Sequence, residues 1–191
     1  MRKKKENKKF NVIMAIFIAV LMVGSIAGYL WTGDNTSLDY NDHSFKIKGE
    51  QLITEVDNQN YYFYYHPTDL ISLNISDAAK QKLVNSEMIY LTFDPYTEKI
   101  EYVETARFDL TNEFLKTGKV MLNGQTKESE YNLPLIDCNN ATEFTPVIYF
   151  RQGNKTEIYN QGDCIIAEAS FEQAFIALKD RIMYTVLGIL E

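Results

Sequence analysis

The sequence has few of the residues from which common catalytic and metal sites are built. It contains two histidines, His43 and His66, and nine glycines that occur singly along the chain. It has no HExxH motif, no paired CxxC motif, no glycine-rich phosphate loop and no GxSxG elbow. We therefore assign no catalytic residue, no metal ligand and no cofactor.

Positive charge is also scarce outside the first nine residues. Residues 1–9 carry +5, whereas the whole chain carries −7, so residues 10–191 carry −12. Binding to nucleic acid is dominated by Lys and Arg side chains that contact phosphates. The acidic excess therefore argues against a nucleic-acid partner.

One long stretch lacks charge altogether. Residues 10–31 contain no charged side chain, and as a helix they would be roughly 33 Å long, close to the hydrocarbon thickness of a bilayer. Basic flanks of a first membrane segment stay in the cytoplasm. We predict a cytoplasmic stub at 1–9, a single-pass transmembrane helix at 10–31 that acts as a signal anchor in the cell membrane, and an exported remainder. Cleavage by a signal peptidase after Ala27 is the alternative, because small residues precede this position.

The exported part is expected to hold one domain. Residues 32–44 are rich in Asp, Asn, Ser and Thr, which is typical of a tether. Residues 45–191 then have the size of a single extracytoplasmic globular domain. Its two cysteines, Cys138 and Cys164, form an even pair in an oxidising compartment, which is most simply one disulfide.

Four sequons fall on the predicted outer side of the membrane. A glycosylation acceptor is an asparagine followed two positions later by Ser or Thr. The candidates are Asn35, Asn74, Asn140 and Asn154.

The remaining pattern predicts an α+β domain. Runs rich in β-branched and aromatic residues indicate strands at 44–49, 51–56, 61–66, 87–93, 99–104, 119–122, 133–137, 146–150, 156–159 and 164–169. Helices are predicted at 76–85, at 109–118 and from Ser170 to the C-terminus. We expect a mixed β-sheet packed with about three helices, and a parallel crossover from strand 61–65 through helix 76–85 to strand 88–93.

The C-terminal helix is predicted to be amphipathic. A capping box of Ser170 and Gln173 would start it, and an apolar stripe follows at helical spacing. The stripe contains Phe171, Phe175, Leu178, Ile182, Val186 and Ile189. Further apolar residues lie off the stripe, so we expect the helix to be wedged between the sheet and another element. The alternative is an exposed interface for a partner, a second copy or the membrane surface.

Residues 145–162 and the helix after them resemble the end of thioredoxin-like folds. Thr145-Pro146 is followed by VIYF, a turn at RQGN, then TEIY, Gly162 and a terminal helix. The resemblance covers about the last 45 residues, and it implies a cis peptide before Pro146, a strand hairpin and thiol chemistry. The CxxC motif of that family is absent, and Cys138 and Cys164 lie 26 positions apart. A structural cystine is the simpler interpretation.

Five consecutive aromatic residues are the strongest indication of a binding role. Because successive side chains of a strand point to opposite faces, the run YYFYY places rings on both faces of one strand. Either helices cover both faces, or one ring set contacts a protein or a carbohydrate. The candidates for such a surface are Tyr61, Tyr62, Tyr64 and Tyr65.

The sequence therefore favours a membrane-tethered extracytoplasmic domain with a non-enzymatic binding or structural role. Its expected partner is a protein, a glycan or a second copy of the chain. The alternative is an enzyme with an enclosed site, either a divergent thioredoxin-like oxidoreductase or a hydrolase built on two carboxylates.

Overall fold

The structure, a computed structural model, describes residues 8–31 and 37–190, which belong to two separate units. The first unit contains helix α1, Lys8–Trp31. Among the described residues, no helix combines the length and the apolar character needed to cross a membrane. The membrane anchor at 10–31 stays a prediction. Residues 1–7 of the predicted stub, the start of the tether and the sequon at Asn35 lie outside the described residues.

The second unit, Ser37–Glu191, contains two β-sheets. The first is an antiparallel meander in the order β1-β2-β3-β4. The second has the order β6-β5-β7-β9-β8, in which β8 alone runs antiparallel to its neighbour. The strands are β1 Ser37–Tyr40, β2 His43–Lys48, β3 Gln51–Val56, β4 Gln59–Phe63, β5 Met88–Phe93, β6 Val120–Asn123, β7 Val147–Gln152, β8 Glu157–Gln161 and β9 Cys164–Ala169.

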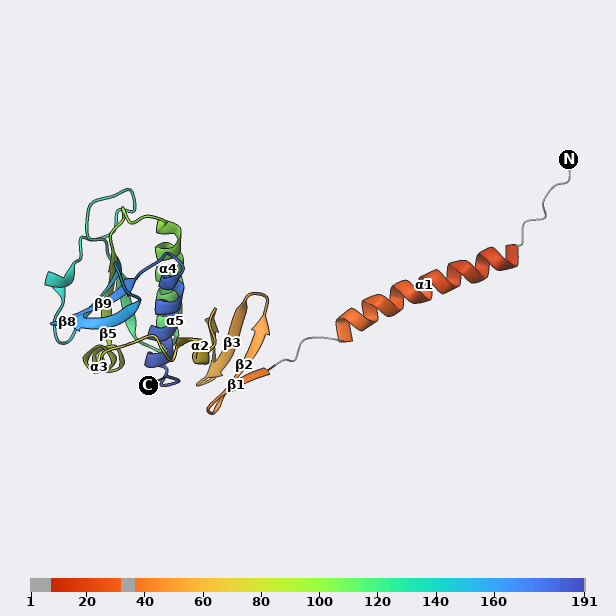
Figure 1. Cartoon of the computed structure of the whole chain (residues 1–191), viewed down its shortest axis with the longest axis horizontal. Helices are drawn as coiled ribbons and strands as arrows, with labels where there is room; N and C mark the ends of the chain where they lie inside the picture. The colour runs from red at the N-terminus through yellow and green to blue at the C-terminus, as the bar shows by residue number, and fades with distance from the viewer. Residues whose placement is uncertain (1–7, 32–36, 191) are drawn as a thin grey trace. The chain divides into compact units, whose positions relative to one another are not determined.

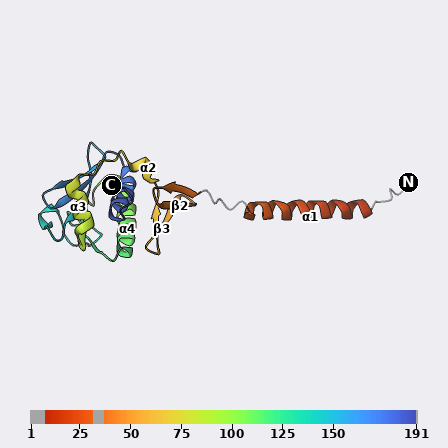
Figure 2. The ribbon, with the colours of Figure 1, turned by 90° about the horizontal axis from the view of Figure 1, so that it is seen from below.

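Helices fill the space between the two sheets (Figures 1 and 2). The helices of this unit are α2 Pro67–Leu70, α3 Asp77–Asn85, α4 Ile100–Lys116 and α5 Ala174–Val186, with a short 3-10 turn η1 at Cys138–Asn140. One apolar core joins both sheets to α4 and α5. The ring of Tyr184 on α5 stacks on Phe63 of β4 with centroids 4.0 Å apart, while Phe175 at the other end of α5 meets Phe150 of β7. The mixed α+β fold is confirmed, with two sheets in place of one.

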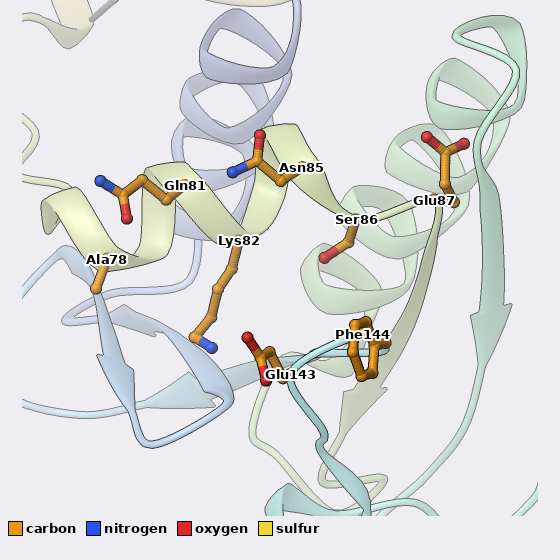
Figure 3. A pocket seen from close by; sticks show the side chains of 8 residues that line it. All are labelled: Ala78, Gln81, Lys82, Asn85, Ser86, Glu87, Glu143 and Phe144. Carbon is orange, nitrogen blue, oxygen red and sulfur yellow. The ribbon is translucent and has the colours of Figure 1, made fainter.

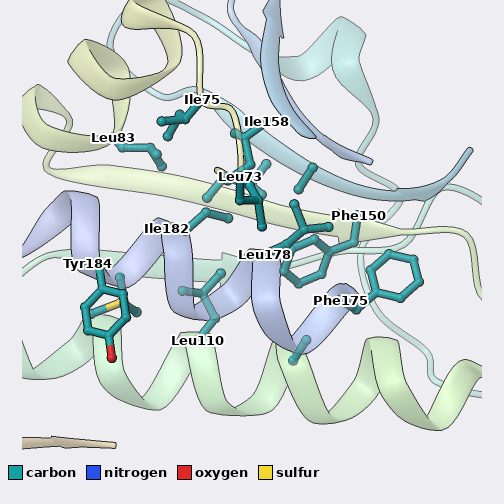
Figure 4. Close-up of a cluster of buried hydrophobic side chains, with 14 of the residues drawn as sticks. Leu73, Ile75, Leu83, Leu110, Phe150, Ile158, Phe175, Leu178, Ile182 and Tyr184 are labelled. Carbon is teal, nitrogen blue, oxygen red and sulfur yellow. The ribbon is translucent and has the colours of Figure 1, made fainter. Parts of the chain in front are cut away.

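Helix α5 is the central element of the core, as Figure 4 shows. Its buried residues point in every direction around the helix axis, because a sheet lies on each side and α4 packs alongside. The predicted wedge between a sheet and another element is therefore confirmed. The helix begins at Ala174, however, and the predicted capping box does not form, since the Ser170 hydroxyl is hydrogen-bonded to Thr156.

Helix α4 corrects two sequence predictions. The strand expected at 99–104 is wrong, and the helix expected at 109–118 begins at Ile100. Apolar and polar residues alternate over 99–104, which suggested a strand. The helical spacing of the buried residues is the stronger signal, and these residues are Val103, Ala106, Leu110 and Phe114. By contrast, the helix predicted at 76–85 is confirmed, because the Ser76 hydroxyl accepts a hydrogen bond from the Ala79 amide at the start of α3.

The strand pairing differs from the prediction in three places. Strand β1 and the first residues of β2 lie within 37–44, a segment predicted as part of the tether. Strands β4 and β5 belong to different sheets, so the predicted parallel crossover between them is wrong. Residues 133–137 form no strand and contribute one bridge, between Gln125 and Leu135. The sequence shows which runs are extended, but pairing depends on distant contacts.

The disulfide between Cys138 and Cys164 is confirmed, with Cα atoms 5.2 Å apart. It ties η1 to the first residue of β9, on the sheet face opposite the helices, where Ile136, Val147 and Ile166 pack together. The thioredoxin-like ending is not found. The described residues contain no cis peptide bond, so the bond before Pro146 is trans. In the expected hairpin, β7 would pair with β8, but β9 lies between these two strands.

Candidate functional site

An open groove between the meander sheet and the two central helices is lined by three tyrosines and four other residues. We call it the tyrosine groove; it has a volume of about 480 Å³. Its lining residues come from the β2–β3 turn, the segment after β4, and the helices α4 and α5. They are Glu50, Tyr64, Tyr65, Tyr102, Thr105, Gln173 and Ile176. Aromatic walls with a few polar groups are typical of ligand sites.

Buried polar side chains of α5 hold the end of β4 at this groove. The carboxylate of Asp180 accepts hydrogen bonds from the backbone amides of Tyr64 and Tyr65, at 2.7 and 2.9 Å. The hydroxyl of Tyr184 donates to the carbonyl oxygen of Tyr65 at 2.7 Å. Because Asp180 is fully buried, these bonds form away from water and fix the backbone that carries the two groove tyrosines.

Lys179 completes this arrangement from the same turn of α5. Its ammonium group donates to the carbonyl oxygen of Tyr62 at 3.2 Å and forms an ion pair with Asp180. It also lies 5.3 Å from the centre of the Tyr64 ring, within range of a cation–π contact. Burial raises the pKa of Asp180, and Lys179 together with the two amides opposes that shift.

The hydroxyl of Tyr64 is held by a second set of polar groups. Burial and the nearby carboxylate of Asp109 raise the pKa of Tyr64, while a hydrogen bond from Gln51 lowers it. The phenol is therefore neutral at physiological pH. Across the groove, the Gln173 amide donates to the hydroxyl of Tyr102 at 3.4 Å. The groove thus presents ring faces and hydrogen-bonding groups together.

The structure separates the four tyrosines that the sequence suggested. Tyr64 and Tyr65 line the tyrosine groove and are half-buried. Tyr62 is half-buried next to the ammonium group of Lys116. Tyr61 is 2% exposed and belongs to the core, so its ring is not part of a binding surface. Tyr102 and Gln173 were missed because α4 and the start of α5 were placed incorrectly.

A wider hollow of about 650 Å³ lies between α3 and the loop before β7. Figure 3 shows Lys82 projecting from α3 toward Glu143, with Phe144 nearby. Lys82 is already engaged in an ion pair with Asp163, and Phe144 is 82% exposed. This hollow offers one aromatic ring where the tyrosine groove offers three.

Three of the sequons lie in described parts of the chain. Asn74, Asn140 and Asn154 are all exposed. The side-chain oxygen of Asn140 accepts a hydrogen bond from the Asp137 amide, which caps η1. Glycosylation at these positions stays a prediction.

Comparison with known proteins gives one informative similarity. No family model and no solved structure matches the chain. The chain is 28% identical over 120 residues to the polyisoprenyl-teichoic acid–peptidoglycan teichoic acid transferase TagU of Bacillus licheniformis. The matched region is 62% of this chain and spans 37% of the length of that relative.

Proposed function

We propose that this chain is a membrane-tethered domain of the cell envelope that binds a carbohydrate of the wall in the tyrosine groove. The observation that carries the proposal is the groove itself, in which Tyr64, Tyr65 and Tyr102 stand together with polar groups suited to sugar hydroxyls. Sugars combine apolar ring faces with hydroxyl groups, so they match such a lining. The name of the Bacillus relative, which mentions teichoic acid and peptidoglycan, supports a wall polymer as the ligand.

The rigid backbone of the groove supports binding of this kind. Four hydrogen bonds to buried side chains of α5 hold residues 62–65 in place before a ligand arrives. Preorganisation reduces the conformational entropy that association costs. Tyrosine also loses little rotamer freedom on binding, which is one reason that it is common at recognition surfaces.

The tether is proposed from the sequence. Residues 10–31 form an uncharged stretch that follows a basic segment, which favours an N-terminus inside the cell and a domain outside. The disulfide in the domain agrees with an oxidising compartment. We propose that the anchor keeps the domain at the outer side of the cell membrane.

Retention of the protein on wall polymers tests this function. Full-length protein in detergent would be mixed with insoluble peptidoglycan, with and without attached teichoic acid, and the bound fraction measured after sedimentation. We expect specific retention that soluble wall fragments compete away. Tyr102→Ala should reduce retention strongly, whereas Phe144→Ala, which removes an exposed ring outside the groove, should not. Absence of retention on both materials would contradict the proposal.

A further inference from the structure

A second pocket lies at the point where the strand order of the five-stranded sheet reverses. From β5 the chain crosses through α4 to β6 on one side and later returns to β7 on the other side. In open sheets with parallel strands, ligands bind at the carboxyl ends of the two strands that flank such a switch point. Here those strands are β5 and β7.

The pocket at this position has a volume of about 400 Å³, and we call it the switch-point pocket. The loop after β5 lines one side, and the end of β7 lines the other. Its residues are Asp94, Tyr96, Thr97, Glu98, Tyr149, Arg151 and Gln152. This volume is within the range of pockets that enclose small molecules.

Charges of opposite sign face each other across the pocket. Asp94 and Glu98 come from the loop after β5, and Arg151 comes from β7. Asp94 is held from behind by Lys127, with 2.6 Å between Nζ and Oδ2. Arg151 is held in the same way by Glu168. Two ion pairs therefore fix the orientation of both walls.

Glu168 is fixed by close packing as well as by hydrogen bonds. It accepts bonds from the amides of Asn154 and Lys155, in addition to its pairing with Arg151. A Cβ atom on Gly153 would lie 2.1 Å from the carboxyl carbon of Glu168, so a side chain at position 153 would push this carboxylate out of its place. In the described part of the chain, the hydrogen bonds of Arg151 use Nη2. Neither bond uses Nη1 or Nε of Arg151, whose side chain lines the pocket.

Tyr149, which is on β7 like Arg151, also lines the pocket. Burial and the carboxylate of Asp94 raise the pKa of Tyr149, while Arg151, Lys127 and the Thr126 hydroxyl lower it. The net shift is upward, so its hydroxyl is protonated and can donate a hydrogen bond. A donor in this position suits an anionic group next to Arg151.

From this arrangement we infer that the switch-point pocket binds a small zwitterion, namely a free α-amino acid or a free dipeptide. The ligand ammonium group pairs with Asp94 and Glu98, and the ligand carboxylate accepts hydrogen bonds from Arg151 and Tyr149. A simple anion would meet the repulsion of the two carboxylates, and a simple cation would meet Arg151 and Lys127. A ligand with both charges satisfies both walls. This inference does not depend on carbohydrate binding in the tyrosine groove.

A nuclear magnetic resonance titration with matched ligands tests the inference. Full-length protein labelled with ¹⁵N, in detergent, would be titrated with alanyl-alanine, with its N-acetyl form, with its C-terminal amide and, separately, with inorganic phosphate. We expect alanyl-alanine to shift the amides of residues 94–98 and 149–152. Each blocked form should bind about tenfold more weakly, because it loses one charge-assisted contact. Equal binding of all three forms, or stronger shifts with inorganic phosphate, would overturn the inference, as would the absence of shifts in these segments.

Two variants and a control locate the effect. Arg151→Gln removes the contact with the ligand carboxylate. Glu98→Gln removes the negative charge of an exposed lining residue and leaves the ion pairs Asp94–Lys127 and Arg151–Glu168 in place. Both should weaken alanyl-alanine binding. Arg107→Gln breaks an ion pair with Glu104 on α4, outside the pocket, and should leave binding unchanged. If Arg151→Gln does not fold, Glu98→Gln still decides, and unchanged binding in that variant counts against the inference.

Discussion

The carboxylate of Asp180 on α5 accepts a hydrogen bond of 2.7 Å from the backbone amide of Tyr64, directly after β4. This contact joins residues 116 positions apart and links the C-terminal helix to the wall of the tyrosine groove. Asp180 is fully buried and also pairs with Lys179. Stability and ligand recognition therefore depend on the same buried group.

Replacement of Asp180 should destabilise the domain strongly. In Asp180→Ala, the ammonium group of Lys179 and two amides lose their acceptor inside the core, which should cost about 3–5 kcal/mol of unfolding free energy. Urea unfolding followed by circular dichroism measures the change. Asp77→Ala is the matched control, because Asp77 pairs with Lys80 at 3.5 Å on an exposed surface and its loss should have little effect. Similar losses in both variants would contradict the assigned role.

The hydroxyl of Tyr184 should contribute separately from its ring. Tyr184→Phe leaves the carbonyl oxygen of Tyr65 without its 2.7 Å donor and should cost about 1–3 kcal/mol. Tyr184→Ala also removes the ring stacked on Phe63 and should cost about 3–5 kcal/mol. Equal unfolding free energies for Tyr184→Phe and the unchanged protein would show that this bond does not hold the groove.

The disulfide should stabilise the domain without taking part in binding. Its sequence separation is 26, so the chain-entropy account gives about 3–4 kcal/mol for a loop of this size. The double variant Cys138→Ala, Cys164→Ala should unfold at lower urea by that amount. Its retention on wall polymers under native conditions should be unchanged. Loss of retention in a folded double variant would point to a functional role for the cysteines.

Acid should destabilise the domain partly through Glu168. The hydrogen bond from Arg151 lowers the pKa of Glu168 below its ordinary value of 4.5, and burial opposes this shift. A carboxylate whose pKa is lower in the folded state than in the unfolded state stabilises the fold at pH values above its unfolded-state pKa. This stabilisation is lost as the pH falls through its folded-state pKa. The melting temperature, measured between about pH 6 and pH 3, should fall steeply below pH 4.5. The fall should be smaller in Glu168→Gln. Parallel curves for the two proteins would contradict this origin.

Several elements could be predicted because their signals are local. The Ser76 cap and the apolar spacing of the C-terminal helix depend on neighbouring residues, and both elements were located from the sequence. The second half of helix α4 was predicted, but its first half was taken for a strand because Ile100 and Tyr102 alternate with polar residues, although Val103, Ala106 and Leu110 continue at helical spacing. The division into two sheets depends on contacts between distant residues, which composition does not reveal.

The candidate sites show the same distinction. Tyr64 and Tyr65 were found because an aromatic run is visible in the sequence. Tyr102 and Gln173 join them only through the packing of α4 and α5 against the end of β4. The switch-point pocket needed the strand order, since Asp94 and Arg151 are 57 positions apart and meet where β5 and β7 lie side by side.

The most direct test of the central claim is the affinity of the full-length protein for soluble fragments of peptidoglycan and of teichoic acid. Isothermal titration calorimetry would measure it for the unchanged protein, Tyr102→Ala and Phe144→Ala. Binding through the tyrosine groove predicts a loss of affinity of about tenfold or more in Tyr102→Ala, because it removes one aromatic wall. Phe144→Ala should bind like the unchanged protein. Equal affinity of all three proteins, or no binding to any fragment, would contradict the account.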